Sequence, residues 1–316
     1  MIEVKNIVKQ YGDKYAVNDI SFTINSGEIV GFLGPNGAGK STTMNIITGY
    51  LSATSGSVTI DGTDILEEPT KAKKLIGFLP ELPPLYMDMT VREYLNFVYD
   101  LKKCKFPREP HIKEICELIK ITDVYDRMIK NLSKGYKQRV GFAQALIGNP
   151  PVLILDEPTV GLDPRQIIEI RNLIKKLGKN HTVILSTHIL QEVQSVCDRI
   201  IVINKGQIVA DGEAERLSYK VAGNRKFIVR ISGPQNEIIK AIRSLDSVTY
   251  VEALTLKEEG AYDYLVESLP NVDIRKMMFA MLAKKGWPIL GLRSMDMSLE
   301  DVFVQLITNE TGEVTE

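Results

Sequence analysis

The sequence is poor in cysteine and in net charge. Its 316 residues include 3 cysteines, Cys104, Cys116 and Cys197, which lie far apart and form no CxxC pair. This spacing excludes a disulfide framework and is typical of a protein from a reducing compartment. The formal net charge of −1 provides no basic field that would attract nucleic acid or anionic lipid.

Long apolar runs are also lacking. The runs Val152–Leu155 and Ile200–Ile203 are far shorter than the roughly 20 apolar residues that span a bilayer. The N-terminal stretch MIEVKNIVKQYG lacks the apolar run that a secretory signal contains. We therefore expect no spanning segment, so that any work at a membrane needs a second, spanning polypeptide.

Several short β-branched runs end in polar residues, with helical patterns between them. The runs are Glu28–Leu33, Val152–Leu155 and Thr182–Thr187. This alternation predicts an α/β fold with a parallel sheet. Because ligands bind beyond the carboxyl ends of such strands, we expect the three polar groups that follow these runs to meet in one site.

Local signals place several helices. Thr90 with Glu93 forms a capping-box pattern, and Asp163 followed by Pro164 marks another helix start, with Gly178 expected at its C′ position. Residues from about 82 to 147 are mostly helical by periodicity. They predict a helical insertion between two halves of the α/β fold.

A second unit is predicted to begin near Leu217. Its pattern is a βαββαβ order with a terminal helix, as in ferredoxin-like α+β domains. The predicted elements are strand Lys226–Ser232, helix Asn236–Leu245, strands Val248–Leu254 and Tyr262–Val266, helix Val272–Lys285, strand Ile289–Arg293 and helix Ser298–Thr308. The unit could dimerise, sense a small molecule or brace the first unit. Tyr264 and Trp287 are interpreted as packing residues.

Residues 34–42 read GPNGAGKST and match the phosphate-loop pattern G-x-x-x-x-G-K-[ST] between a predicted strand and a predicted helix. The glycines let successive N–H groups face a polyphosphate, and the helix points its positive end at it. Lys40 adds charge at the β- and γ-phosphates, and Ser41 offers a hydroxyl to Mg²⁺. The predicted nucleotide-binding residues are Gly34, Pro35, Asn36, Gly37, Ala38, Gly39, Lys40, Ser41 and Thr42.

Two further groups follow strands. Asp156 can hold Mg²⁺, and Glu157 can orient and polarise an attacking water. His188 follows the third strand, where it can hydrogen-bond a γ-phosphate. The predicted catalytic residues are therefore Glu157, His188 and Lys40. Taken singly, the acidic pair could be a helix cap and His188 an ordinary polar residue.

With these motifs the chain resembles the ATP-binding cassette (ABC) family over about residues 1–217. The matching segments keep the family's order: Walker A at Gly34–Thr42, the signature at Leu132–Tyr136, Walker B at Val152–Glu157, the D-loop at Gly161–Asp163 and the switch histidine at His188. The resemblance implies a P-loop NTPase cassette with a RecA-like core, a β-subdomain and a helical subdomain. The C-terminal unit, residues 218–316, is then an accessory domain.

The resemblance adds site residues and shows departures. Tyr11 matches the aromatic residue that stacks on adenine, and Ser133 and Gly135 match the γ-phosphate contacts of the signature. Lys134 and Tyr136 stand where the family usually has Gly and Gln. Lys134 could add charge toward the phosphate or face solvent.

Glu81 is a further departure, because it stands at the usual Q-loop glutamine. Glutamate can still take a Mg²⁺-bound water, so the expected metal site comprises Ser41, Glu81 and Asp156. The Leu-Pro-Glu variant and residues 298–303 are similar to the ABC-2 exporter subgroup. Within this subgroup, the signature Leu-Ser-Lys-Gly-Tyr followed by Gln-Arg-Val-Gly is similar to gliding-motility-type ATP-binding subunits.

The resemblance implies an ATPase that uses ATP and Mg²⁺ on the inner face of the cell membrane. The expected partners are a membrane permease and a second copy, whose signature closes over the ATP, with no nucleic acid involved. Two alternatives stay open. One is a soluble ABC ATPase that acts on ribosomes or nucleic acid, and the other is a module that binds ATP without hydrolysis.

Overall fold

The computed structural model describes residues 1–213, 225–258, 260–269, 272–295 and 303. The chain divides into two compact units, Met1–Glu213 and Ala214–Glu316, and each is described by itself. The boundary expected near Leu217 lies outside the described residues. None of the described helices is long and apolar enough to cross a membrane.

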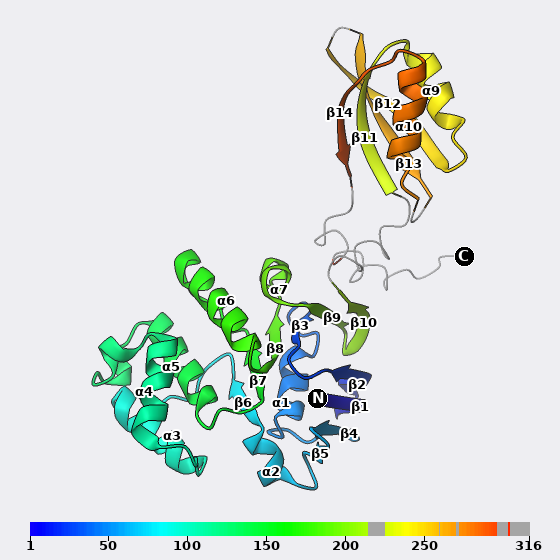
Figure 1. Ribbon diagram of the computed structural model, residues 1–316. Coiled ribbons are helices and arrows are strands. Elements are labelled where there is room, and N and C mark those ends of the chain that lie inside the picture. Colours follow the sequence, from blue (N-terminus) through cyan, green and yellow to red (C-terminus); the bar gives the residue numbers. More distant parts are fainter. Residues whose placement is uncertain (214–224, 259, 270–271, 296–302, 304–316) are drawn as a thin grey trace. The chain divides into compact units, whose positions relative to one another are not determined.

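The centre of the first unit is a sheet of strand order β10-β9-β3-β8-β7-β6 (Figure 1). All its strands run parallel except β10, which pairs antiparallel with β9. The strands are β3 (Ile29–Leu33), β6 (Ile76–Leu79), β7 (Val152–Asp156), β8 (Thr182–Thr187), β9 (Arg199–Asn204) and β10 (Gln207–Gly212). The three runs predicted from the sequence are therefore neighbours, in the order β3-β8-β7.

Both faces of this sheet are covered. Along β7, Leu153 and Leu155 belong to one apolar core with helix α6 (Pro164–Gly178), while Val152 and Ile154 belong to a second core with helix α1 (Lys40–Ile47). Burial on both faces explains why β3, β7 and β8 are continuous β-branched runs rather than alternating ones.

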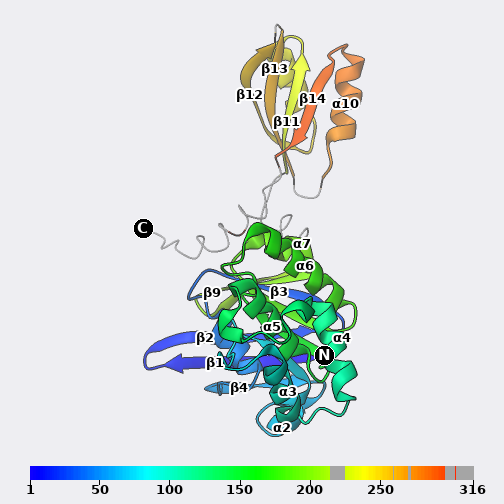
Figure 2. The same ribbon diagram turned by 90° about the vertical axis from the view of Figure 1, so that its left-hand side faces the viewer.

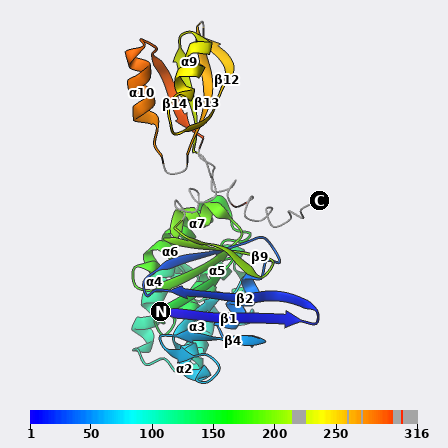
Figure 3. The ribbon, with the colours of Figure 1, turned by 90° about the vertical axis from the view of Figure 1, so that its right-hand side faces the viewer.

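The second core is closed by an antiparallel sheet of order β2-β1-β4-β5, seen side-on in Figure 3. It corresponds to the predicted β-subdomain. Its strands are β1 (Ile2–Tyr11), β2 (Lys14–Ile24), β4 (Ser55–Ile60) and β5 (Thr63–Asp64). Helix α1 packs on apolar side chains from both sheets. The phosphate loop that precedes α1 is thus held from two sides.

The predicted helical insertion is confirmed. It contains α3 (Val91–Leu101), α4 (Arg108–Ile119) and α5 (Lys134–Leu146), with two short 3-10 turns before α5. The capping box at Thr90 and the caps at Asp163 and Pro164 are present. The remaining described helices of this unit are α2 (Pro69–Lys74) and α7 (Leu190–Val196).

The role expected for Gly178 is wrong. Gly178 is the last residue of α6, and the cap is Lys179. A Cβ at Gly178 would lie 2.3 Å from Cδ1 of Ile29. Close packing of the helix on the Ile29 side chain of β3, rather than a left-handed turn, therefore favours glycine here.

The second unit has the predicted ferredoxin-like arrangement (Figure 2). Its four strands pair antiparallel in the order β12-β13-β11-β14. Its elements are β11 (Arg225–Ser232), α9 (Gln235–Arg243), β12 (Val248–Glu258), β13 (Ala261–Ser268), α10 (Arg275–Lys284) and β14 (Ile289–Ser294). Tyr264 is fully buried in its core, as expected. The predicted helix Ser298–Thr308 lies, except for Phe303, outside the described residues.

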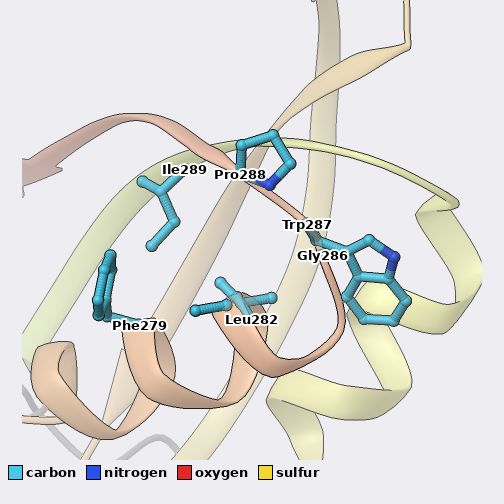
Figure 4. A pocket seen from close by; sticks show the side chains of 7 residues that line it. Phe279, Leu282, Gly286, Trp287, Pro288 and Ile289 are labelled. Carbon is cyan, nitrogen blue, oxygen red and sulfur yellow. The ribbon is translucent and has the colours of Figure 1, made fainter.

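An apolar pocket of about 340 Å³ lies where α10 leads into β14 (Figure 4). Phe279 and Leu282 face it from the helix, and Trp287 borders it from the connecting turn. Trp287 also packs against Gly233, where a Cβ would lie 3.0 Å from the indole ring. The packing role expected for Trp287 is therefore observed, and the residue also borders a cavity.

We expect Thr90→Ala to lower the free energy of unfolding of the first unit by about 1 kcal/mol. The variant loses the bond from the Glu93 N–H to Thr90 Oγ1, 3.2 Å, and the bond from the Thr90 hydroxyl to the Glu93 carboxylate, 2.9 Å. Urea unfolding followed by circular dichroism measures the change. Thr90→Ser is the matched control and should stay near wild type, and equal losses in both variants would contradict the capping role.

Candidate nucleotide-binding site

The glycine loop connects β3 to α1 in a conformation that only small residues allow. Gly37 and Gly39 have φ of 80° and 107°, in the left-handed region. A Cβ at Gly39 would also lie 2.4 Å from the carbonyl oxygen of Ala16. The loop is therefore closed against β2 and leaves its N–H groups at the start of α1.

Lys40 is held inside the loop rather than extended into solvent. Its side chain is 6% exposed, and Nζ donates to the carbonyl oxygens of Gly34 at 2.9 Å and Pro35 at 3.2 Å. The same Nζ lies 3.5 Å from Oε1 of Glu157. The ammonium group is thus fixed before any phosphate arrives.

Glu157 and His188 meet because β7 and β8 are adjacent and parallel. Nδ1 of His188 lies 2.9 and 3.0 Å from the two carboxylate oxygens of Glu157. The Glu157 N–H donates to the carbonyl oxygen of Ser186 at 2.8 Å, which joins the two strand ends. The carboxylate therefore lies between a lysine and a histidine, as the strand-end argument predicts.

These groups surround a pocket of about 400 Å³, large enough for part of a nucleotide. Nine of its lining residues were predicted from the sequence: Asn36, Gly37, Gly39, Lys40, Ser41, Thr42, Glu81, Glu157 and His188. Ala16 and Val160 also line it and were missed, because a lone small or apolar residue carries no chemical signal.

Six predicted nucleotide-binding residues lie outside that lining: four near the loop and on β1, and two in the signature. The carbonyl oxygens of Gly34 and Pro35 accept from Nζ of Lys40, and the Ala38 N–H donates to the Pro35 carbonyl oxygen. These three residues therefore hold the loop in shape without lining the pocket. Tyr11 is 53% exposed at the end of β1, with Nζ of Lys9 5.1 Å from the centre of its ring. Its aromatic face is therefore accessible, and its role with adenine stays a prediction.

Asp156 fits the expected Mg²⁺ site. Its side chain is buried, and Oδ1 has no hydrogen-bond partner among the described residues. Burial raises the pKa of this carboxyl, and Glu157 and Glu81 raise it further, whereas the nearby Ser186 and Ser41 hydroxyls lower it. A buried oxygen without a partner, beside a serine hydroxyl and a second carboxylate, is an all-oxygen donor set that suits Mg²⁺.

The signature residues lie apart from this pocket. Ser133 caps α5 by accepting from the Tyr136 N–H at 3.4 Å, and its side chain is exposed. Gly135 lines a different pocket of about 410 Å³, together with Gln166. Within the described part of the chain, neither Ser133 nor Gly135 lines the phosphate pocket.

The structure places the two unusual signature residues. Nζ of Lys134 lies so close to Gly161 that a Cβ there would be 1.9 Å from it. Tyr136 donates from its hydroxyl to Asp123 at 2.6 Å. Lys134 therefore reaches the D-loop of its own chain, and it remains exposed to solvent.

A glycine loop between a parallel strand and a helix, with carboxylates at the neighbouring strand end, defines a P-loop nucleotide-binding cassette. The family model described as ABC transporter matches residues 17–160. The linearmycin resistance ATP-binding protein LnrL of Bacillus subtilis is 34% identical over 97% of this chain and 98% of its own length. The chain belongs to the family of ABC transporter ATP-binding proteins.

Two further similarities support this assignment. The Nod factor export ATP-binding protein I of Burkholderia orbicola is 31% identical over 98% of this chain and 97% of its own length. A dimeric structure of the ATP-binding cassette MJ0796 in a post-hydrolysis state, bound to ADP and Pi, is 30% identical. It covers 67% of this chain and 98% of its own, with a TM-score of 0.62.

Asp156→Asn should leave the nucleotide-free protein at least as stable as wild type at pH 7.5. The raised pKa means that ionised Asp156 opposes folding above both its unfolded and folded pKa values, and asparagine removes that charge. With ATP and Mg²⁺ the wild type should become more stable than the variant. A ligand at 100 times its Kd stabilises a protein by about 2.7 kcal/mol, and the variant gains less because it binds Mg²⁺ less well.

Thermal unfolding with and without ATP and Mg²⁺ measures both effects, and ATP with EDTA is the control. A variant that is less stable without nucleotide, yet gains as much from Mg²⁺ as wild type, would contradict the metal assignment.

Proposed function

We propose that this chain hydrolyses ATP and drives a separate membrane exporter. The observation that carries the proposal is the contact of the buried Glu157 carboxylate with both Lys40 and His188 at the wall of the phosphate pocket. A module that only binds ATP needs the loop and Lys40, whereas a carboxylate held by a histidine is the arrangement for activating water.

Each residue has a defined task in this reaction. Lys40 and the loop N–H groups hold the β- and γ-phosphates and offset the charge of the transferring phosphoryl group. Glu157 orients the attacking water and takes up its proton. Nδ1 of His188 faces Glu157, so Nε2 is the ring nitrogen left for the γ-phosphate. Mg²⁺, held by Ser41, Asp156 and Glu81, would supply additional positive charge at the phosphate oxygens.

The active form is a dimer of two chains. Ser133 and Gly135 lie outside the phosphate pocket of their own chain, so the signature of a second copy closes over each ATP. A similar cassette whose structure is dimeric supports this arrangement. The exposed ring of Tyr11 is the proposed stacking partner of adenine.

The membrane partner docks on an apolar surface beside Glu81. We call the exposed residues Leu82, Tyr86, Met87 and Phe97 the α3 surface. The rings of Tyr86 and Phe97 lie edge to face, 5.3 Å apart. A patch of this kind suits a cytoplasmic helix of a permease, and the proposed site of action is the inner face of the cell membrane. Relatives named for linearmycin resistance and Nod factor export support export as the direction.

Glu157→Gln should lower kcat by at least about 100-fold, because the variant cannot take the proton of water. ATP binding should persist, since Lys40 and the loop are unchanged. With ATP and Mg²⁺ the variant should elute as a dimer in size-exclusion chromatography, because closed dimers are no longer opened by hydrolysis.

The double variant Glu157→Gln with Ser133→Arg is the matched control and should elute as a monomer with ATP. Wild-type turnover in Glu157→Gln would refute the catalytic role, and an ATP-bound Glu157→Gln variant that stays monomeric would refute the split site.

Phe97→Asn should weaken retention by membranes and leave the ATPase rate of the isolated chain unchanged. The side chain lies on α3, away from the phosphate pocket, so only partner docking loses apolar contact. Co-purification of the tagged chain with a hydrophobic protein from detergent extract measures the effect. An equivalent change at exposed Ile168 on α6 is the control. Tight association with ribosomes or DNA in place of a membrane protein would favour the other class of ABC ATPase.

A further inference from the structure

Glu192 is a buried carboxylate that does not line the phosphate pocket. It lies on α7 and is 1% exposed. A buried carboxylate is costly unless its oxygens are hydrogen-bonded. Here each oxygen has a hydroxyl donor: Oε1 accepts from Thr159, and Oε2 accepts from Thr187 at 3.0 Å. Glu192 therefore joins two segments that are distant in sequence.

Those two threonines flank the catalytic pair. Thr159 lies two residues after Glu157, and Thr187 directly precedes His188. Oγ1 of Thr187 also accepts from the Ile189 N–H at 3.1 Å. The hydroxyl hydrogen of Thr187 is thus directed to Glu192, and the backbone on both sides of His188 is tied to one hydroxyl group.

The backbone of Glu157 needs such support. Its φ of 48° is in the left-handed region, which costs free energy for a residue with a side chain. The Glu157 N–H donates to the Ser186 carbonyl oxygen at 2.8 Å, and the Val160 N–H donates back to the Glu157 carbonyl oxygen at 3.2 Å. The bond from the Thr159 hydroxyl to Glu192 fixes the turn between Glu157 and Val160 to helix α7.

We propose that Glu192 is a positioning residue that keeps Glu157 and His188 at hydrogen-bond distance by clamping Thr159 and Thr187. This role rests on the proposed ATP hydrolysis, in which these two side chains hold the attacking water. Glu192 is not among the residues that line the phosphate pocket. A carboxylate suits the task because its two acceptor oxygens fix two hydroxyl groups at once.

The decisive comparison is between two apolar variants. Glu192→Leu leaves both threonine hydroxyls buried without an acceptor, so Tm and kcat should both fall. In the triple variant Thr159→Val, Thr187→Val and Glu192→Leu no buried hydroxyl is left unpaired, and only the Ile189 N–H loses its acceptor, so Tm should regain most of what Glu192→Leu loses. A purely structural role predicts that kcat returns as well. A positioning role predicts that kcat stays at least about tenfold low, with KM for ATP within about twofold of wild type.

Glu192→Gln is the conservative rescue. Its carbonyl oxygen can accept from Thr187, and its amide can donate to Thr159 after that hydroxyl rotates. It should therefore keep most of wild-type kcat. A triple variant with wild-type kcat would overturn the positioning role.

A second readout does not depend on hydrolysis. The chain has 3 histidines, so ¹⁵N-histidine labelling gives few signals, and His188→Gln assigns the one of interest. In the triple variant the His188 ring signals should shift, while those of His111 and His181 stay in place. If the His188 signals shift in the triple variant but the wild type shows no ATPase activity, the proposed hydrolysis is rejected and the positioning role of Glu192 is kept. Unshifted His188 signals would reject the clamp itself.

Discussion

The buried contact between Lys40 and Glu157 is the interaction on which the site depends. Each residue is 6% exposed, and neither charge could be buried alone without a large cost. Lys40 comes from the loop after β3, and Glu157 follows β7, with β8 between these strands. The sheet order therefore brings the opposite charges together, and His188 at the end of β8 completes the cluster.

The first unit is arranged so that this cluster stays rigid. The strands that carry it are buried on both faces, and the loop is closed against β2 by its glycines. Glu157 keeps a left-handed backbone that only a constrained environment holds. By contrast, the signature lies on a separate, helical part of the unit, at the start of α5. One half of the proposed reaction centre is preorganised, and the other half arrives with a second chain.

The features that the sequence predicted correctly depend on residues that lie close together in the chain. A capping box such as Thr90 with Glu93 is satisfied within four residues, and the phosphate loop needs its glycines whatever surrounds it. The role of Gly178 was predicted wrongly because its cause is distant: Ile29 on β3 leaves no room for a side chain. Ala16, Val160 and Glu192 gave no signal, since an alanine, a valine and a glutamate are ordinary residues until the fold places them.

The sequence by itself therefore determined the fold class and the residue types of the site: a glycine-rich loop, polar residues after parallel strands, and a signature segment. Only the tertiary structure decided which of these groups share one pocket and which belong to another. The physical reason is that side-chain type is a local property, whereas adjacency depends on strand order. That order set Glu157 between Lys40 and His188, while the fold brought Lys134 next to Gly161 and left Ser133 outside the phosphate pocket.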